Sequence, residues 1–156
     1  MNIPNLIFTD LPDYVTHGNY FSIATGCTFL EAAQQHLAAV NHKCVYTTNY
    51  GQPLNAPSKI TFGHDVWVGT GVHFIAPVNV GNGAIIGAYS VIAKDVPAYA
   101  VVVGNPQVVK RYRFTPEQIE KLEKIQWWNW EEDILMERMK DLQDVDVFIK
   151  KYIDTD

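Results

Sequence analysis

Apolar residues in the middle of the chain recur every six positions. Written in sixes from Phe62, the sequence reads FGHDVW, VGTGVH, FIAPVN, VGNGAI, IGAYSV and IAKDVP. The first position of each hexapeptide is apolar and large, occupied by Phe62, Val68, Phe74, Val80, Ile86 and Ile92. The fifth position is small or β-branched, occupied by Val66, Val72, Val78, Ala84, Ser90 and Val96. A strand repeats at two residues and a helix at 3.6, so a period of six indicates short strands that turn corners.

These hexapeptides predict a parallel β-helix. Each would supply one short strand and one turn, and three would complete a triangular coil that stacks on the next. Glycine follows the first position at Gly63, Gly69, Gly81 and Gly87, where it relieves crowding or permits positive φ at a corner. A weaker upstream run has Leu11, His17, Ile23, Phe29 and Gln35 in the first column and Val15, Phe21, Cys27, Ala33 and Ala39 in the fifth. Together the two runs amount to roughly four coils.

The repeat is interrupted once and then gives way to helices. Between the two runs, residues 43–58 contain several Gly, Pro and Asn residues and no repeat, which predicts a loop extruded from the coil. Further on, Thr115 is a candidate N-cap, Pro116 suits the first helical position, and Gln118 completes a capping box. A helix is therefore expected to begin here.

The two kinds of pattern divide the chain into two parts. We predict a β-helix domain over residues 1–112 and a C-terminal helical extension over residues 113–156. Within the extension, Trp127, Trp128 and Trp130 form an aromatic cluster that we expect to pack on the end of the prism rather than to bind a ligand.

Composition argues against several kinds of partner. The formal net charge is −5, and the Lys and Arg residues are scattered, which argues against a nucleic-acid partner. No apolar run approaches the roughly 20 residues of a membrane span, and no charged-then-apolar leader opens the chain. Only Cys27 and Cys44 occur, so we expect a reduced, cytoplasmic protein in which Cys27 fills the core.

Four segments in order, FGHDVWVGTGVHF, IIGAYSVIAKDVP, VVVGNP and QWWNW, resemble the hexapeptide-repeat acyltransferases. The chain is most similar to their xenobiotic acetyltransferase branch, which includes the streptogramin and type-B chloramphenicol acetyltransferases. Related sugar and polysaccharide acetyltransferases share the same body. The resemblance implies a mainly β fold, a left-handed parallel β-helix, although crossovers are usually right-handed. It also implies acetyl-CoA as acyl donor and a homotrimer with active sites between subunits.

The same resemblance implies that His42 is the catalytic base, because it matches the Asn-His pair that precedes the extruded loop in these enzymes. Acetyl transfer from a thioester requires removal of the acceptor's proton, and one imidazole with a pKa near neutrality suffices. We expect direct transfer, without Cys44 as a covalent acyl carrier. The sequence after His42 departs from the family pattern, which leaves the acceptor open between a sugar or sugar nucleotide, which we favour, and an antibiotic.

Residues for the donor are carried over from matched motifs. Coenzyme A is expected to lie along a prism edge between subunits, bound mainly by backbone groups at successive turns. The matched positions are Trp67, Thr70, Ala88, Ala93, Lys94 and Arg111. Trp67 would wall the thioester end of the cleft, although it can also be a surface aromatic at a subunit interface. Lys94 and Arg111 can also be ordinary surface charges.

Two other functional classes stay open at this stage. A non-catalytic trimeric scaffold or binding module would explain the weak upstream repeat and the altered segment after His42. A zinc site of the γ-carbonic anhydrase type would need His42, His64 and His73 to converge between subunits. We expect no metal site, with His64 and His73 solvated at outward-facing positions.

Overall fold

The computed structural model describes residues 5–29 and 59–154. His42, Cys44 and the predicted loop at 43–58 lie outside these ranges. The described strands are β1 (Leu6–Ile7), β2 (Val15–Thr16), β3 (Ser22–Ile23), β4 (Thr28–Phe29), β5 (Ile60–Phe62), β6 (Trp67–Val68), β7 (His73–Phe74), β8 (Asn79–Val80), β9 (Ile85–Ile86), β10 (Val91–Ile92), β11 (Ala100–Val103) and β12 (Val108–Tyr112).

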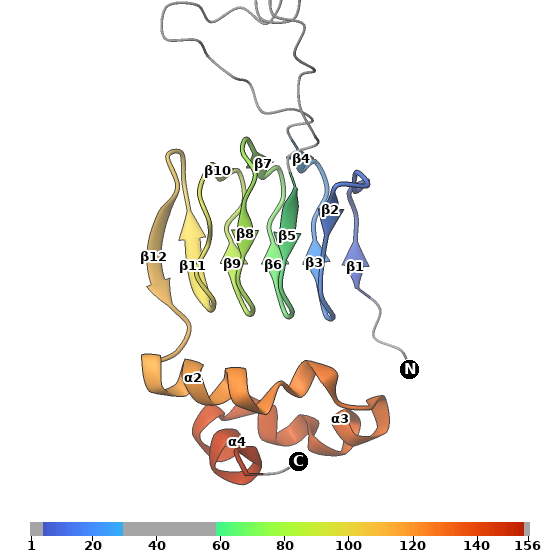
Figure 1. Cartoon of the computed structure of the whole chain (residues 1–156), viewed down its shortest axis with the longest axis vertical. Coiled ribbons are helices and arrows are strands. Elements are labelled where there is room, and N and C mark those ends of the chain that lie inside the picture. Colours follow the sequence, from blue (N-terminus) through green and yellow to red (C-terminus); the bar gives the residue numbers. More distant parts are fainter. Residues whose placement is uncertain (1–4, 30–58, 155–156) are drawn as a thin grey trace, which may run out of the picture.

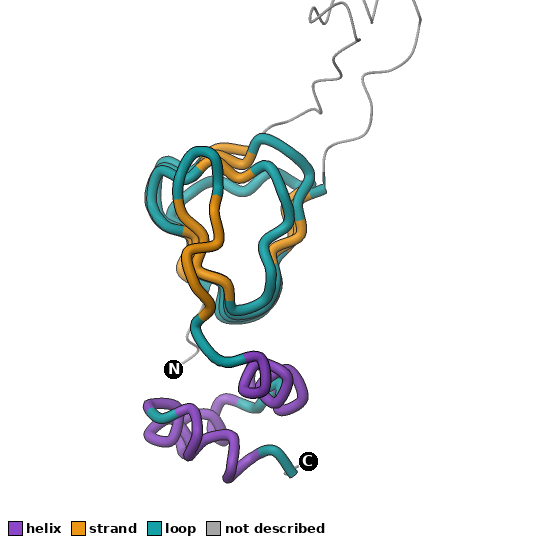
Figure 2. Tube along the Cα trace, turned by 90° about the vertical axis from the view of Figure 1, so that its left-hand side faces the viewer, coloured by secondary structure: helices purple, strands orange, loops and turns teal. Residues whose placement is uncertain are grey.

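The strands form three flat sheets that wrap into a prism. Their orders are β1-β3-β6-β9-β11-β12, β10-β7-β4 and β2-β5-β8, and every pairing is parallel except the β11–β12 hairpin at the end. From β3 to β10, successive strands visit the three sheets in turn, so each complete coil contributes one strand to each sheet. Seen nearly end-on, the coil has a rounded triangular outline (Figure 2). The predicted parallel β-helix is thereby confirmed, and the structure is mainly β with helices at its C-terminal end.

The two columns of the hexapeptide repeat form the core of the prism. All six residues at the first position are at most 3% exposed, and all six at the fifth position are at most 2% exposed. Burial of each large apolar side chain among them contributes about 1.5–3 kcal/mol. In the weaker upstream run, Val15, Phe21, Ile23 and Cys27 are also buried. The period of six was therefore a reliable guide to which side chains point inward.

Turns stack above one another at the three corners of the prism. We call the corner between the β2-β5-β8 sheet and the six-stranded sheet the covered corner; it comprises residues 17–20, 63–65, 81–83 and 97–99. The open corner, between the six-stranded sheet and the β10-β7-β4 sheet, comprises residues 24–26, 69–71 and 87–89. The third corner comprises residues 75–77 and 93–95. Positive φ recurs at the first two, at Tyr20, Asp65, Gly83 and Tyr99 and at Gly26, Gly71 and Tyr89.

The helical segments follow β12 closely. They are α2 (Pro116–Ile125), η1 (Trp127–Asn129), α3 (Glu132–Arg138), η2 (Met139–Gln143) and α4 (Val145–Tyr152). The predicted start is confirmed, since Thr115 caps α2 and forms a capping box with Gln118. No helix in the described ranges is long and apolar enough to cross a membrane.

The aromatic cluster of the helices lies along the prism rather than on its end, so that prediction was wrong. Helix α2 runs beneath successive coils, along the direction in which they stack (Figure 1). Trp128 stacks on His64 at 5.3 Å between ring centroids, and Trp127 packs on Tyr20 at 5.1 Å. The reason is that the covered corner presents rings from successive coils, at Tyr20, His64 and Tyr99, against which the helices pack.

Candidate functional site

The six residues expected to bind the donor are all exposed and lie in three pairs. Thr70 and Ala88 are neighbours at the open corner, and Ala93 and Lys94 occupy the third corner. Trp67 and Arg111 lie on the six-stranded sheet. Within one subunit the structure therefore does not gather all six into a single cluster.

At the open corner, the backbones of two coils approach closely, and the turn residues Thr70 and Ala88 are exposed. The N–H of Tyr89 donates to the carbonyl of Thr70 at 2.8 Å. A Cβ placed on Gly69 would lie 2.7 Å from the backbone nitrogen of Ala88, so only glycine fits there. The side chains of Thr70 and Ala88 are small, which leaves room for a ligand along this edge.

Tyr89 stands beside this edge and was not among the residues singled out from the sequence. Its side chain is 71% exposed, and its ring covers Gly71 of the preceding coil. Its φ of 58° places it in the left-handed region, which is unfavourable for a bulky residue. The sequence signal was available, because Tyr89 follows Gly71 by three hexapeptides and an exposed aromatic on a turn is a common binding feature.

At the third corner, the backbone N–H groups of Ala93 and Lys94 already have a partner. Both donate to Oε1 of Gln107, at 2.6 and 3.0 Å, and Nε2 of Gln107 donates to the carbonyl of Lys94 at 3.0 Å. Gln107 was missed because it reaches this turn only through the β11–β12 hairpin. Its side chain braces the turn on which we expected donor contacts.

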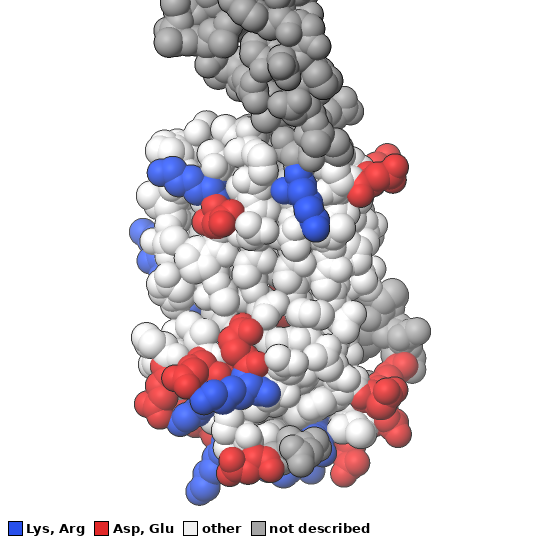
Figure 3. All heavy atoms as spheres, viewed as in Figure 1, with Lys and Arg blue, Asp and Glu red and all other residues white. Residues whose placement is uncertain are grey.

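The outer face of the six-stranded sheet carries a mainly apolar row of side chains, in which Leu6 and Trp67 are exposed and Ile85 and Val101 are partly buried. Trp67 is 53% exposed and lies in register between Ser22 and Ile85, and Ile85 continues to Val101 and then Arg111. Three strand spacings separate Trp67 from Arg111, or roughly 14 Å. On the face seen in Figure 3, charged side chains gather over the helices and leave the middle of the prism largely uncharged.

His64 and His73 lie on different sides of the prism. His64 is half-buried at the covered corner, where its Nδ1 accepts a hydrogen bond from the N–H of Asn19 at 2.9 Å. Burial lowers the pKa of His64, so the expectation of a solvated surface histidine was wrong for this residue. His73 is exposed on β7, with Nδ1 2.6 Å from Oγ1 of Thr28. No group of three metal-ligand side chains occurs among the residues that the structure describes.

The covered corner is held by an ion pair with several partners. Nη1 of Arg113 donates to Oδ2 of Asp65 at 2.8 Å and to the carbonyl of Gly83 at 2.8 Å. Burial raises the pKa of Asp65, and Arg113 opposes this shift through its hydrogen bond and charge. Next to Gly83 in the sequence, Nδ2 of Asn82 donates to Oε2 of Glu123 on α2 at 2.9 Å. These contacts fix the helices to the prism.

Comparison with known proteins agrees with this architecture. Residues 59–94 match the family model described as bacterial transferase hexapeptide (six repeats). A chloramphenicol acetyltransferase from Klebsiella aerogenes is 32% identical over 132 residues, covering 76% of this chain and 60% of the relative. Another from Morganella morganii is 31% identical over 150 residues, covering 90% of this chain and 71% of the relative.

The chain thus spans 60% and 71% of the length of these two relatives. Among solved structures, a mutant of AntD, an N-acyltransferase from Bacillus cereus crystallised with dTDP and coenzyme A, has the same fold. The TM-score is 0.51 at 18% identity, covering 70% of this chain and 57% of that one. The family match, the two relatives and the stacked hexapeptides agree, and the chain belongs to the hexapeptide-repeat acetyltransferases.

Proposed function

We propose that this chain is an acetyl-CoA-dependent acetyltransferase that modifies a small hydroxyl or amine acceptor. The observation that carries the proposal is the open corner of an acetyltransferase-type prism, where the exposed Thr70 and Ala88 lie close to the exposed rings of Trp67 and Tyr89. The name of the relatives, chloramphenicol acetyltransferase, supports the same chemistry.

The donor lies along this edge in the proposal. Backbone groups at Thr70 and Ala88 bind the pantetheine arm, and the ring of Trp67 excludes water from the thioester end. Lys94 and Arg111 supply positive charge for the phosphates, which are best matched by cationic side chains. Ala93 contributes through its turn, which Gln107 braces.

His42 acts as general base in the proposed mechanism. It takes the proton from the acceptor's O–H or N–H as that oxygen or nitrogen attacks the thioester carbonyl. The carbon–sulfur bond breaks, the thiolate leaves with the electron pair, and the proton on His42 passes to it. One histidine therefore serves both steps, and no covalent intermediate on the enzyme is needed.

A homotrimer with left-handed prisms completes the proposal. Its support is the mainly apolar row on the outer face of the six-stranded sheet, where Leu6 and Trp67 are 50% and 53% exposed. Such a row is stabilised when a second copy covers it, and a closed threefold ring buries one such face of each subunit. The active sites would then lie in the clefts between neighbouring subunits.

The acceptor class in the proposal follows from two opposing indications. The relatives are named chloramphenicol acetyltransferases, which makes a hydroxylated antibiotic one candidate acceptor. The altered sequence after His42, Lys43-Cys44-Val45-Tyr46, favours a different acceptor, and we rank sugars and sugar nucleotides first.

The test measures release of coenzyme A thiol with amino sugars, sugar nucleotides, chloramphenicol and a streptogramin. His42→Ala should reduce turnover by about 10²–10⁴-fold, the usual contribution of a general base. His73→Gln, which changes an exposed histidine, should leave it unchanged. Equal rates in wild type and His42→Ala would refute the assigned base, and failure to bind acetyl-CoA by calorimetry would favour the scaffold.

A further inference from the structure

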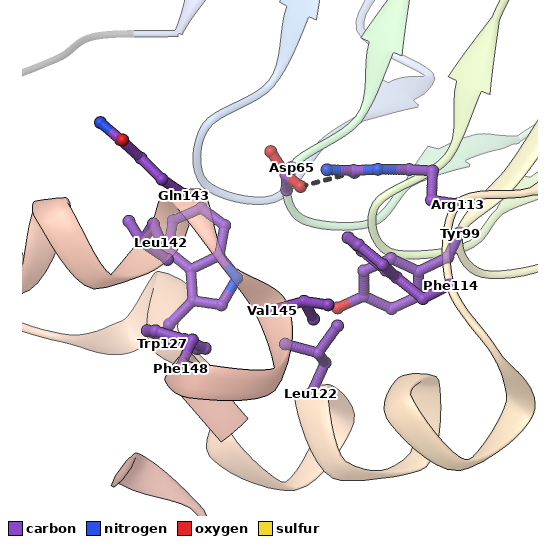
Figure 4. Close-up of a pocket in the computed structure, with 10 residues that line it drawn as sticks. All are labelled: Asp65, Tyr99, Arg113, Phe114, Leu122, Trp127, Leu142, Gln143, Val145 and Phe148. Carbon is purple, nitrogen blue, oxygen red and sulfur yellow. Dashed lines mark hydrogen bonds and ion pairs between the residues drawn. The ribbon is translucent and has the colours of Figure 1, made fainter. Parts of the chain in front are cut away.

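A cavity of about 320 Å³ lies between the covered corner and the helices (Figure 4). The prism contributes Asp65 and Tyr99, the connection after β12 contributes Arg113 and Phe114, and the helical segments close the remaining sides. Sites for small molecules typically enclose about 300–1,000 Å³, so this volume suits a compact ligand. The cavity is at a different corner from Thr70 and Ala88.

The walls of the cavity are mainly apolar, with polar groups at one side. Phe114, Leu122, Trp127 and Phe148 supply rings and an aliphatic side chain. The ion pair between Asp65 and Arg113 lies along the prism side, where both side chains are about one quarter exposed, at 29% and 26%. An apolar lining with a few polar groups is the usual composition of a ligand site.

The hydroxyl of Tyr99 is the unexplained group in this cavity. Tyr99 is 1% exposed, and its hydroxyl has no hydrogen-bond partner among the residues that the structure describes. An unsatisfied buried donor costs about 1–3 kcal/mol. The ring itself is explained by packing, because it covers Gly83 of the preceding coil. Phenylalanine would pack equally well there, so packing does not account for the hydroxyl.

The surroundings determine the charge of a suitable ligand. Burial, with the charges of Glu123 and Asp65, raises the pKa of Tyr99, so its hydroxyl keeps its proton and is a donor. Arg113 is already paired with Asp65 at 2.8 Å, so its charge is compensated. The hydroxyl lies toward Leu122 and Val145 (Figure 4), and the nearby carboxylates of Glu123 and Asp65 disfavour an anionic ligand. A neutral acceptor fits this position best.

We propose that the cavity binds a small neutral molecule that places an apolar ring against Phe114 and Trp127 and accepts a hydrogen bond from the hydroxyl of Tyr99. The ligand would satisfy the buried donor and fill the apolar volume at the same time. This site is independent of the proposed acetyl transfer, since it uses none of the residues assigned to the donor or to the base.

The test uses two probes of equal size and shape on the full chain. Acetophenone carries a carbonyl acceptor, and α-methylstyrene replaces that oxygen with a methylene group. Binding is followed by the indole resonance of Trp127 in protein NMR spectra. Tyr99→Phe should weaken acetophenone about five- to tenfold, the equivalent of one neutral hydrogen bond, and leave α-methylstyrene unchanged. Leu142→Trp, which fills the cavity, should abolish binding of both probes.

Several results would overturn the proposal. They are equal acetophenone affinity in wild type and Tyr99→Phe, unaltered binding in Leu142→Trp, or no binding of either probe at millimolar concentration. Thermal unfolding of Tyr99→Phe provides the folding control, because removal of an unsatisfied hydroxyl should leave stability unchanged or increase it. A crystal structure with acetophenone in which Tyr99 donates to water instead would also contradict it.

Discussion

The covered and open corners are built from the same hexapeptide turn, yet they serve different purposes. Both have stacked coils, close backbone contacts and recurring positive φ. At the covered corner, His64, Asn82 and Arg113 form side-chain hydrogen bonds between coils and to α2. At the open corner, Thr70 and Ala88 carry short side chains in exposed turns. The repeat therefore determines the backbone, and the side chains at each turn decide whether a corner is structural or available to a ligand.

The largest expected effect tests whether the covered corner is the more rigid of the two. A Cβ on Gly69 would lie 2.7 Å from the backbone nitrogen of Ala88, and one on Gly81 would clash with the backbone nitrogen of Ala98 still more closely. Because the helices fix Ala98 and Tyr99 from outside, we expect Gly81→Ala to destabilise by about 3 kcal/mol and Gly69→Ala by about 2 kcal/mol. Urea unfolding measures both.

Gly26→Ala is the matched control for these two variants. Its nearest neighbours would be 3.9 Å from the new Cβ, but its φ of +75° adds backbone strain of about 1 kcal/mol. A loss in Gly69→Ala as large as that in Gly81→Ala would show that the helices do not stiffen their corner.

The second prediction removes the ion pair at the covered corner. Arg113→Met leaves the half-buried carboxylate of Asp65 without its partner, so we expect a loss of about 2 kcal/mol at pH 7. Burial already raises the pKa of Asp65, and without Arg113 it should rise further. The folded state then binds the proton more tightly than the unfolded state, so stability should recover as the pH falls through the folded pKa.

Urea unfolding at pH 7 and pH 5 measures this effect. Lys121→Met is the control, since its pair with Glu117 within α2 is exposed and should contribute less than about 0.5 kcal/mol. A loss in Arg113→Met that is equal at both pH values would mean that the charge of Asp65 is not its cause.

The sequence predicted the prism well because its signal is periodic and local. Each hexapeptide repeats the same choice of buried residue, so the inward positions from Phe62 to Val96 follow from the period alone, and Thr115 marked the helix start. Gln107 and Trp128 were different, because their partners are Lys94 and His64. These contacts depend on where the β11–β12 hairpin and the helical extension pack against the prism, and the hexapeptide period does not encode those positions.

The third prediction concerns the third corner, where a side chain substitutes for a missing strand partner. If Gln107 positions the turn at Ala93 and Lys94 for the donor, Gln107→Leu should raise KM for acetyl-CoA about fivefold with little change in kcat, since neutral hydrogen bonds contribute about 1 kcal/mol. Gln107→Glu keeps the acceptor oxygens but loses the donor to the carbonyl of Lys94. Its KM for acetyl-CoA should therefore lie between those of the wild type and Gln107→Leu. A lower KM in Gln107→Leu would instead show that Gln107 competes with the donor for these N–H groups.

The smallest expected effect is a pH dependence from His64. Burial beneath Trp128 lowers the pKa of His64, so between pH 6.5 and the lower folded pKa the unfolded state binds the proton first. Stability should therefore fall as the pH drops below 6.5, and protonation of Nδ1 would also remove the hydrogen bond from Asn19. His64→Gln should flatten this slope by less than about 1 kcal/mol, measured as thermal stability between pH 7.5 and 5.5. Asp65 contributes equally to the pH dependence of the wild type and of His64→Gln, so the difference between their slopes of stability against pH isolates His64. Identical slopes would show that the stacked imidazole is not responsible for acid sensitivity at the covered corner.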